Sequence, residues 1–564
     1  MMRRPRYLVE IERVLGCTLF GSADIFAAVT GPAQEAPIRG PMMEYRLGEI
    51  ALGNEQTQTV SFEALAAGRY TYLREGRSMT TTREPFSPGG CLVQRLRRGG
   101  ARWSWALALA LALLVTPSLA SAQPVEAPDT YGGDFWSRPR LTGDWGGLRD
   151  ELAKKGIVLD VDLLLTPQGV ASGGRDTGAE FWGTAEYTLG VNTQKLGLWP
   201  GGFLNVYALS GFGDSSVNRD SGATVPVNLA AILPDFGNET TALMNLTFMQ
   251  FLSEKFGVFA GKMNGLTGDD NEFAHNHRTT FMNMGLDLNT VLALFPISAY
   301  GGGIVVLPWE GAVFTASAID PSGTPTNNDI SEAFDDGVLV NAQGRVTIKP
   351  FGLVGHQLVG FGWSNKDRLS LEQDPSNLAR LLLTERFPRL ADPGPILTRI
   401  LERFFPTLLV PTQPPNTESD TWAVYYNFDQ YVWSPKGDPT RGIGVFFRFG
   451  ASDGVANPIK YAYNVGIGGK GIVPGRPEDT FGIGWSRVEF SDSFVPFLRQ
   501  QLALGLDRED AVEMYYNFSI THWLNASLDL QIINPGLNKT LDSSGQLEDV
   551  NTAVVVGLRL YARF

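Results

Sequence analysis

Polar side chains recur at every second position along several apolar stretches of this 564-residue chain. Asp160 and Asp162 stand between leucines and valines, and Asp529 and Gln531 stand between leucines and isoleucines. Carboxylate, amide and guanidinium groups can replace water around a solute hydroxyl, because each offers more than one hydrogen-bonding atom. We therefore expect such side chains to line a wet channel, which needs no reaction chemistry.

The candidate channel-lining residues lie at these alternating positions or in the loop that begins near residue 264. They are Asp160, Asp162, Glu186, Asn205, Lys262, Asn264, Asn271, Glu272, Arg345, Arg448, Glu513, Asn517, Asp529, Gln531 and Arg559. Three further loop residues, Asp269, Asp270 and His275, are expected to fold inward at a constriction. The alternative for each residue is that it lines a solvated wall without touching solute.

Catalytic and metal-binding patterns are weak. His275 and His277 are two residues apart and match no strong zinc motif. Asp269-Asp270 has the residue types of a glycosidase or a calcium site, but a solvated loop pair is commoner. Gly301-Gly302-Gly303 falls inside a predicted strand, so it is not a phosphate loop. We expect no catalytic residue, no metal and no cofactor.

The alternation predicts an all-β fold, a transmembrane antiparallel β-barrel of about 16 strands. The predicted strands are 157–167, 180–193, 202–212, 242–253, 256–264, 297–307, 311–320, 337–349, 352–365, 420–433, 441–452, 458–469, 479–490, 511–520, 523–534 and 550–564. Short connections mostly follow even-numbered strands and long ones follow odd-numbered strands, as expected for periplasmic turns and external loops. Tryptophans near predicted strand ends, including Trp199, Trp309 and Trp433, suit the two membrane interfaces.

Residues 95–122 form a predicted secretory signal peptide, with arginines, a short apolar run and an Ala-Ser-Ala cleavage site. The alternative, an N-terminal anchor helix, is disfavoured because the apolar run is too short to span a membrane. Residues 1–94 are interpreted as a dispensable leader from an over-long gene model, or as an unusually long natural one. Residues 123–156 are expected to form a periplasmic segment with a short helix that ends at Gly156, and 157–564 the barrel.

Further helical pieces are predicted at 377–387 and 395–409, inside the long connection 366–419.

Composition excludes several classes of function. Residues 123–564 carry 49 acidic and 32 basic residues, a net charge of about −17, which argues against nucleic-acid binding. An acidic lumen should disfavour anions, with Arg448 and Arg559 adding local positive charge. Both cysteines, Cys17 and Cys91, precede the predicted cleavage site, so no disulfide framework is expected after it.

The final stretch to Phe564 alternates apolar and polar residues and ends on an aromatic residue. We expect its apolar face to meet outer-membrane lipid, and we expect Phe564 to be recognised by the barrel-assembly machinery. A homo-oligomer is an open possibility.

An ordered set of short motifs resembles the carbohydrate-selective, OprB-like porins. The motifs are Leu141–Arg149 with Lys155–Ile157, Gly261–Asn264, Asn271–His275, Arg448–Gly450 with Asp453-Gly454, Gly468-Gly469, Pro474–Thr480, Tyr516–Phe518, Trp523, Asp529–Gln531 and Asn534–Gly536. The resemblance covers nearly all of 138–564. It implies a 16-stranded bacterial outer-membrane barrel and passive uptake of sugars such as glucose.

Two alternatives remain open at this point. The same barrel could pass other small solutes, such as cations or organic acids. A secreted β-rich lectin or adhesin is also possible, because a soluble sandwich shows the same period of two.

Overall fold

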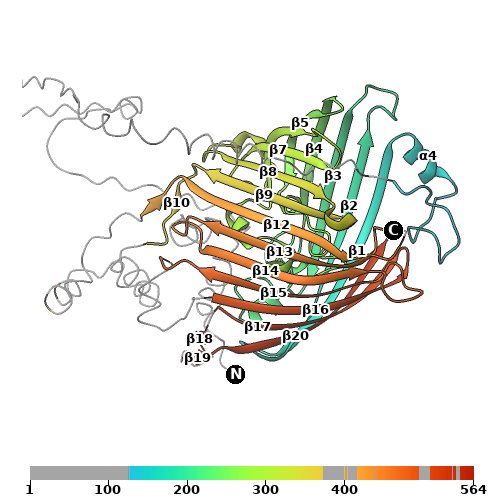
Figure 1. Cartoon of the computed structure of the whole chain (residues 1–564). Coiled ribbons are helices and arrows are strands. Elements are labelled where there is room, and N and C mark those ends of the chain that lie inside the picture. The colour runs from blue at the N-terminus through green and yellow to red at the C-terminus, as the bar shows by residue number, and fades with distance from the viewer. Residues whose placement is uncertain are drawn as a thin grey trace, which may run out of the picture. The chain divides into compact units, whose positions relative to one another are not determined.

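The computed structural model describes residue 125 and residues 127–372, 399, 403, 416–436, 438–493, 508–536, 538–541 and 547–564. Within them, sixteen antiparallel strands close into one barrel (Figure 1). Their bounds are β1 Ile157–Gly174, β2 Gly178–Asn192, β3 Gly202–Gly213, β4 Thr240–Ser253, β5 Phe256–Asn264, β6 Ser298–Val306, β7 Ala312–Ile319, β8 Leu339–Ile348, β9 Gly355–Ser364, β12 Thr421–Trp433, β13 Gly442–Ser452, β14 Ile459–Lys470, β15 Thr480–Phe490, β16 Arg508–Thr521, β17 Leu524–Asn534 and β20 Asn551–Arg563. Each corresponds to a predicted strand, so the fold prediction is confirmed. The predicted end of the first strand was wrong, because β1 continues seven residues past 167.

The remaining described elements are short. Two ribbons pair β10 Arg368–Leu369 with β11 Thr417–Glu418, and β18 Lys539–Leu541 with β19 Leu547–Asp549. The helices are α4 Leu148–Lys154, α5 Val217–Asp220 and α6 Met284–Asp287, and the 3-10 segments are η2 Ala230–Ile232, η3 Gly265–Thr267, η4 Thr290–Leu294, η5 Ile330–Glu332 and η6 Pro350–Gly352. None of the described helices has the length and hydropathy to cross a bilayer.

The helix predicted before Gly156 is present as α4. The predicted signal peptide and leader lie outside the described residues. So does the predicted helical piece 377–387, and of the piece 395–409 only Arg399 and Arg403 are described, both in helical conformation.

The wall of the barrel has its apolar side outward. Leu528 is 56% exposed and Ile483 is 45% exposed on the outer face, whereas Glu513 and Arg448 on the inner face are at most 1% exposed. Successive side chains of a strand point to opposite faces, so this pattern follows directly from the alternation in the sequence. Polar residues inside and apolar residues outside are the reverse of a soluble sandwich and suit a lipid-facing barrel.

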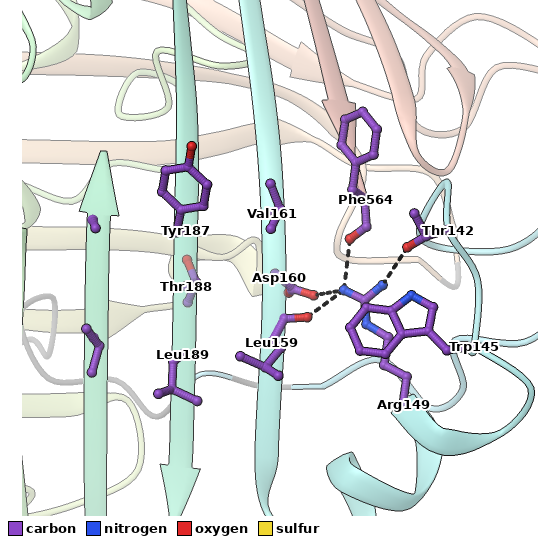
Figure 2. A pocket seen from close by; sticks show the side chains of 12 residues that line it. Thr142, Trp145, Arg149, Leu159, Asp160, Val161, Tyr187, Thr188, Leu189 and Phe564 are labelled. Atoms are coloured by element: carbon purple, nitrogen blue, oxygen red, sulfur yellow. Dashed lines mark hydrogen bonds and ion pairs between the residues drawn. The ribbon is translucent and has the colours of Figure 1, made fainter. Parts of the chain in front are cut away.

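The first and last strands meet at a seam that α4 holds. From α4, Arg149 donates through Nη2 to the carbonyl oxygens of Leu159 and Phe564, at 2.6 and 2.8 Å, and to Oδ1 of Asp160 at 2.6 Å. Its Nη1 donates to Thr142 at 3.3 Å. Figure 2 shows this guanidinium between β1 and the end of β20. One buried cation therefore ties the helix to both strands of the seam.

Long connections gather at one end of the barrel and short turns at the other. The long ones include 214–239, 265–297 and 320–338. Two connections at this end are short, contrary to the expected rhythm: 175–177 between β1 and β2, and 453–458 between β13 and β14. Helix α4 and the chain's last residue lie together at the short-turn end (Figure 1).

Candidate functional site

The connection 265–297, here called the inner loop, folds into the barrel and packs on the inward faces of β12 to β17. Phe281 lies at its centre, with its ring 4.9 Å from that of Tyr515 and 5.4 Å from that of Phe446, both edge-on. Phe273 and Leu286 belong to the same buried cluster. Apolar packing of this kind stabilises a loop that polar contacts alone would leave solvated.

Glycines on the inward face make room for these side chains. A β-carbon built on Gly444 would lie 2.2 Å from Phe273 Cζ, and one on Gly484 would lie 2.7 Å from Leu286 Cδ2. Both distances are shorter than real contacts, so neither position accepts a side chain without displacing the loop. Five glycines of β13, β14 and β15 with such contacts to the inner loop form what we call the glycine floor: Gly444, Gly450, Gly468, Gly482 and Gly484.

Arg448 on β13 fixes the start of the inner loop. Its Nε donates to Asp269 Oδ2 at 2.7 Å, its Nη1 to the Leu286 carbonyl at 2.9 Å, and its Nη2 to the Ala274 carbonyl at 2.6 Å. Asn427 of β12 donates to the other oxygen of Asp269 at 2.7 Å. The Arg448 guanidinium therefore bonds to the inner loop and does not face the open lumen.

The middle of the inner loop is held from β16, β17 and β20. Glu513 accepts from the backbone N–H groups of Met282 and Asn283, at 2.6 and 2.9 Å. Arg559 donates to the carbonyls of His277 and Thr280, at 2.6 and 2.7 Å. Gln531 accepts from the Asn283 side chain at 3.1 Å and donates to the Val227 carbonyl at 2.9 Å. Backbone groups that would otherwise be buried without partners are satisfied in this way.

Several charged side chains remain partly exposed where the inner loop ends and the open wall begins. Arg345 of β8 donates to Asp270 Oδ2 at 2.6 Å, and these side chains are 16% and 33% exposed. Glu272, the next acidic residue along the loop, is exposed. Farther along the inner loop, Arg278 pairs with Glu186 of β2, with Nε 3.0 Å from both carboxylate oxygens, and in this pair only the guanidinium is partly exposed. We call this set of five residues the loop margin.

Other predicted residues hold neighbouring strands or turns. Asp160 is part of the seam contact described above, and Asp162 accepts from the Tyr561 hydroxyl at 2.8 Å. Asn517 accepts from Ser527 at 3.0 Å, and Asp529 accepts from Gln531 at 3.0 Å.

Two predicted residues lie at the start of the inner loop. Asn264 caps η3 by accepting from the Leu266 N–H at 3.1 Å. Asn271 donates to Asn427 Oδ1 at 2.6 Å. Most predicted lining residues therefore position the loop or the wall.

Lys262 was assigned to the wrong face of the wall. On β5 it follows Val258 and Ala260 at intervals of two, and Val258 pairs with Ile304, which is exposed on the outer face. Its side chain is nevertheless fully buried, because the connection 320–338 covers it. Its Nζ donates to the carbonyls of Pro325 and Asn327, both at 2.8 Å. Lys262 therefore fixes this outer connection to the wall and does not line the lumen.

Some residues of the site were not predicted. Arg278 sits in an irregular loop, where no periodicity marks it. Asp429 is an inward residue of an alternating stretch and bonds to His356 at 2.7 Å and to the Glu272 N–H at 3.2 Å. Glu509 accepts from four groups, among them the Val225 N–H at 2.9 Å. Alternation could have identified Asp429 and Glu509, since both face inward.

The titratable groups offer no metal site within the described part of the chain. Burial and the neighbouring Arg278 guanidinium lower the pKa of His277 to about 3, so its ring is neutral at neutral pH. His275 in the same loop has a buried Nδ1 without a hydrogen-bond partner among the described residues.

Comparison with known proteins gives a consistent result. Residues 179–564 match the family model described as carbohydrate-selective porin, OprB family. Porin B of Pseudomonas aeruginosa is 27% identical over 150 residues, which are 24% of this chain and 31% of that protein. The chain thus matches about a third of the length of this curated relative. The high-pH structure of Pseudomonas putida OprB superposes with a TM-score of 0.60 at 20% identity, covering 77% of this chain and all of that one.

Proposed function

Because this chain belongs to the OprB family of carbohydrate-selective porins, we propose that it carries small, glucose-like sugars by passive diffusion through its lumen into the periplasm. It is a bacterial outer-membrane β-barrel, and its family and fold are those of a channel. The finer statements, which sugar passes and in which direction, are part of the proposal.

The loop margin carries the proposal. A sugar that passes a constriction loses part of its hydration shell, and wall groups must replace those hydrogen bonds. Asp270 and Arg345 present a carboxylate and a guanidinium side by side, partly exposed. Glu186 and Arg278 form a second ion pair beside the inner loop, in which the guanidinium is 28% exposed and the carboxylate is buried. Paired opposite charges donate and accept together without favouring a net ionic charge, which suits a neutral polyol.

The direction of uptake rests on the placement of the connections. Short turns and α4 at one end, and long connections at the other, are the arrangement in which the turns face the periplasm. In this orientation the end of β20, which the barrel-assembly machinery is proposed to recognise, is on the periplasmic side.

Liposome swelling tests the proposal. Vesicles containing the barrel should swell faster in glucose than in a disaccharide, and the double variant Asp270→Ala/Arg345→Ala should reduce this preference. Arg441→Ala is the matched control, because Arg441 pairs with Asp438 in a turn outside the lumen. Equal swelling in all sugars, together with a reversal potential that reports strong ion selectivity, would instead favour a channel for ions or organic acids.

A further inference from the structure

An apolar groove of about 510 Å³ lies on the outer face of the barrel, near the short-turn end. Its floor consists of outward side chains that pair in two rows across β1, β2 and β3. They are Leu159, Leu189 and Val206 in one row, and Val161, Tyr187 and Ala208 in the other. We call it the seam groove, because Phe564 at the seam borders it (Figure 2). Its volume is in the range of small-molecule sites.

The floor of the seam groove belongs to the lipid-facing surface of the wall. Leu159 and Val161 are 39% and 41% exposed, in the range of the outward residues named above. Asn205, the neighbour of Val206 on β3, points to the opposite face and therefore into the lumen. The groove is thus continuous with the surface that meets the membrane, and the strand backbones separate it from the channel.

Trp145 borders the seam groove in an unusual backbone conformation. Its φ is 53°, in the left-handed region that residues other than glycine rarely adopt. Gly143, Gly146 and Gly147 around it also have positive φ. The indole is nevertheless 44% exposed, with its ring centroid 4.8 Å from Arg149 Cζ. Backbone strain of this kind occurs at ligand clamps, and an exposed indole suits a membrane interface.

The charged groups at the seam groove bond to one another. Arg149 and Asp160 line it, but their side chains are 2% and 10% exposed and are joined at 2.6 Å. Arg149 also donates to the Phe564 main-chain oxygen and packs against the Tyr131 ring, with Cζ 4.1 Å from the centroid. An ion or a sugar in this groove would lose water and gain few partners in return. The groove therefore suits an apolar ligand.

Lipid chains are the apolar molecules that this surface meets. In a bilayer, an apolar wall attracts apolar partners mainly through close van der Waals packing. A groove with a floor of strands and two bordering rings offers a flexible chain more of these contacts than the open wall does. In the orientation proposed above, the short-turn end faces the periplasm, and the periplasmic leaflet of an outer membrane consists of phospholipid.

We propose that the seam groove binds one acyl chain of a phospholipid, which stays on the barrel longer than the lipids around the open wall. The choice of phospholipid rests on the orientation in the proposed function, whereas binding itself does not depend on sugar transport. The chain lies on the outward side chains of β1, β2 and β3, between Trp145 and Phe564. It adds packing from the membrane to the seam that Arg149 holds.

Native mass spectrometry in mild detergent, which dilutes loosely held lipid, tests the proposal. Added palmitoyl-oleoyl phosphatidylethanolamine should bind the wild-type barrel at one preferred site. Ala208→Trp fills the floor of the groove and should weaken this binding by at least about tenfold, because the indole occupies the space of the chain. Ala342→Trp is the matched control, since Ala342 is an exposed outward residue of β8, and it should bind lipid as the wild type does.

Two results would overturn the lipid site. One is equal lipid binding in the wild type and in Ala208→Trp. The other is a wild-type barrel that carries lipopolysaccharide, or a second copy of the chain, in place of the phospholipid. Liposome swelling keeps the proposed function separate, because a barrel that binds the lipid and passes no glucose contradicts the sugar channel alone.

Fluorescence quenching tests the position of the chain without adding bulk to the floor. One equivalent of phosphatidylethanolamine with a brominated chain, added in detergent, should quench the wild type more than Trp145→Phe, because bromine quenches an indole that it contacts. Trp309→Phe, at an exposed tryptophan between β6 and β7, should be quenched like the wild type. Equal quenching of the wild type and Trp145→Phe would contradict a chain beside Trp145.

Discussion

The Arg448 guanidinium and the Asp269 carboxylate lie 2.7 Å apart, and both side chains are at most 2% exposed. This pair joins the wall of the barrel to a loop 179 residues earlier in the chain. A buried ion pair with its remaining hydrogen bonds satisfied fixes one arrangement of the groups that it connects. The position of the inner loop, and therefore the width of the passage beside it, depends on this contact.

Replacement of Arg448 should release the inner loop. Arg448→Ala leaves Asp269 buried and unpaired, which should cost about 3–5 kcal/mol of unfolding free energy. We expect higher and noisier single-channel conductance and a lower temperature of gel-shift unfolding. Arg441→Ala, at a half-exposed pair, should cost no more than about 1 kcal/mol. Wild-type conductance in Arg448→Ala would show that the loop holds its place without this residue.

Added bulk on the glycine floor should displace the same loop without removing a charge. In Gly444→Ala the new methyl group would overlap Phe273, 2.2 Å away, so we expect a destabilisation of roughly 1–3 kcal/mol and altered conductance. Gly557→Ala is the control, because its nearest neighbour is the flexible side chain of Gln168 at 3.3 Å. Urea unfolding in lipid vesicles measures the unfolding free energy of both variants. Similar losses of unfolding free energy in the two would argue against the steric explanation.

Removal of Lys262 should affect the outer connection and leave transport unchanged. Lys262→Met removes the donor that holds the carbonyls of Pro325 and Asn327. We expect faster proteolysis within 320–338, with glucose swelling rates equal to the wild type. Lys255→Met, at an exposed turn lysine, controls for loss of charge. A change in sugar preference would show instead that the Lys262 side chain faces the lumen.

Acid should weaken the fold through His277. Its folded pKa of about 3 lies below the unfolded value of about 6.5, so the unfolded chain binds more protons between these limits. The contribution of this residue to stability is present above pH 6.5 and falls as the pH drops towards 3. We expect a loss of about 1–3 kcal/mol by pH 4. In His277→Gln this part of the pH dependence should disappear, and an unchanged profile would mean that other groups cause it.

The strands were predictable because their side chains face two solvents. Lipid outside and polar contacts inside impose a period of two that is visible in the sequence alone, as in Asp529 and Gln531 between leucines and isoleucines. The end of β1 was not predictable, because Pro167 to Gly174 lacks that alternation although the backbone continues in the sheet.

The bonding partners of the inward residues were less predictable. Arg448, Glu513 and Arg559 face the lumen as expected, yet they bond to a loop that periodicity does not describe. The partly exposed pair of Asp270 and Arg345 joins a loop residue to a strand residue 75 positions later. One available signal was the run of inward glycines, which leaves space on the wall where a second segment packs. For Lys262, a count of positions from Val258 would have given the correct face.

The glycine floor confines the packed loop to one half of the wall, so the two halves differ in how freely their residues can be exchanged. Side chains on β12 to β17 are committed to contacts that tolerate almost no extra atom. The described glycines of β3 to β8 do not meet the inner loop in this way, although Leu209, Met249 and Phe259 there are buried in apolar clusters. For anyone adapting this barrel as a molecular sensor, added bulk is therefore better placed at the partly exposed inward positions of β3 to β8 than on the glycine floor.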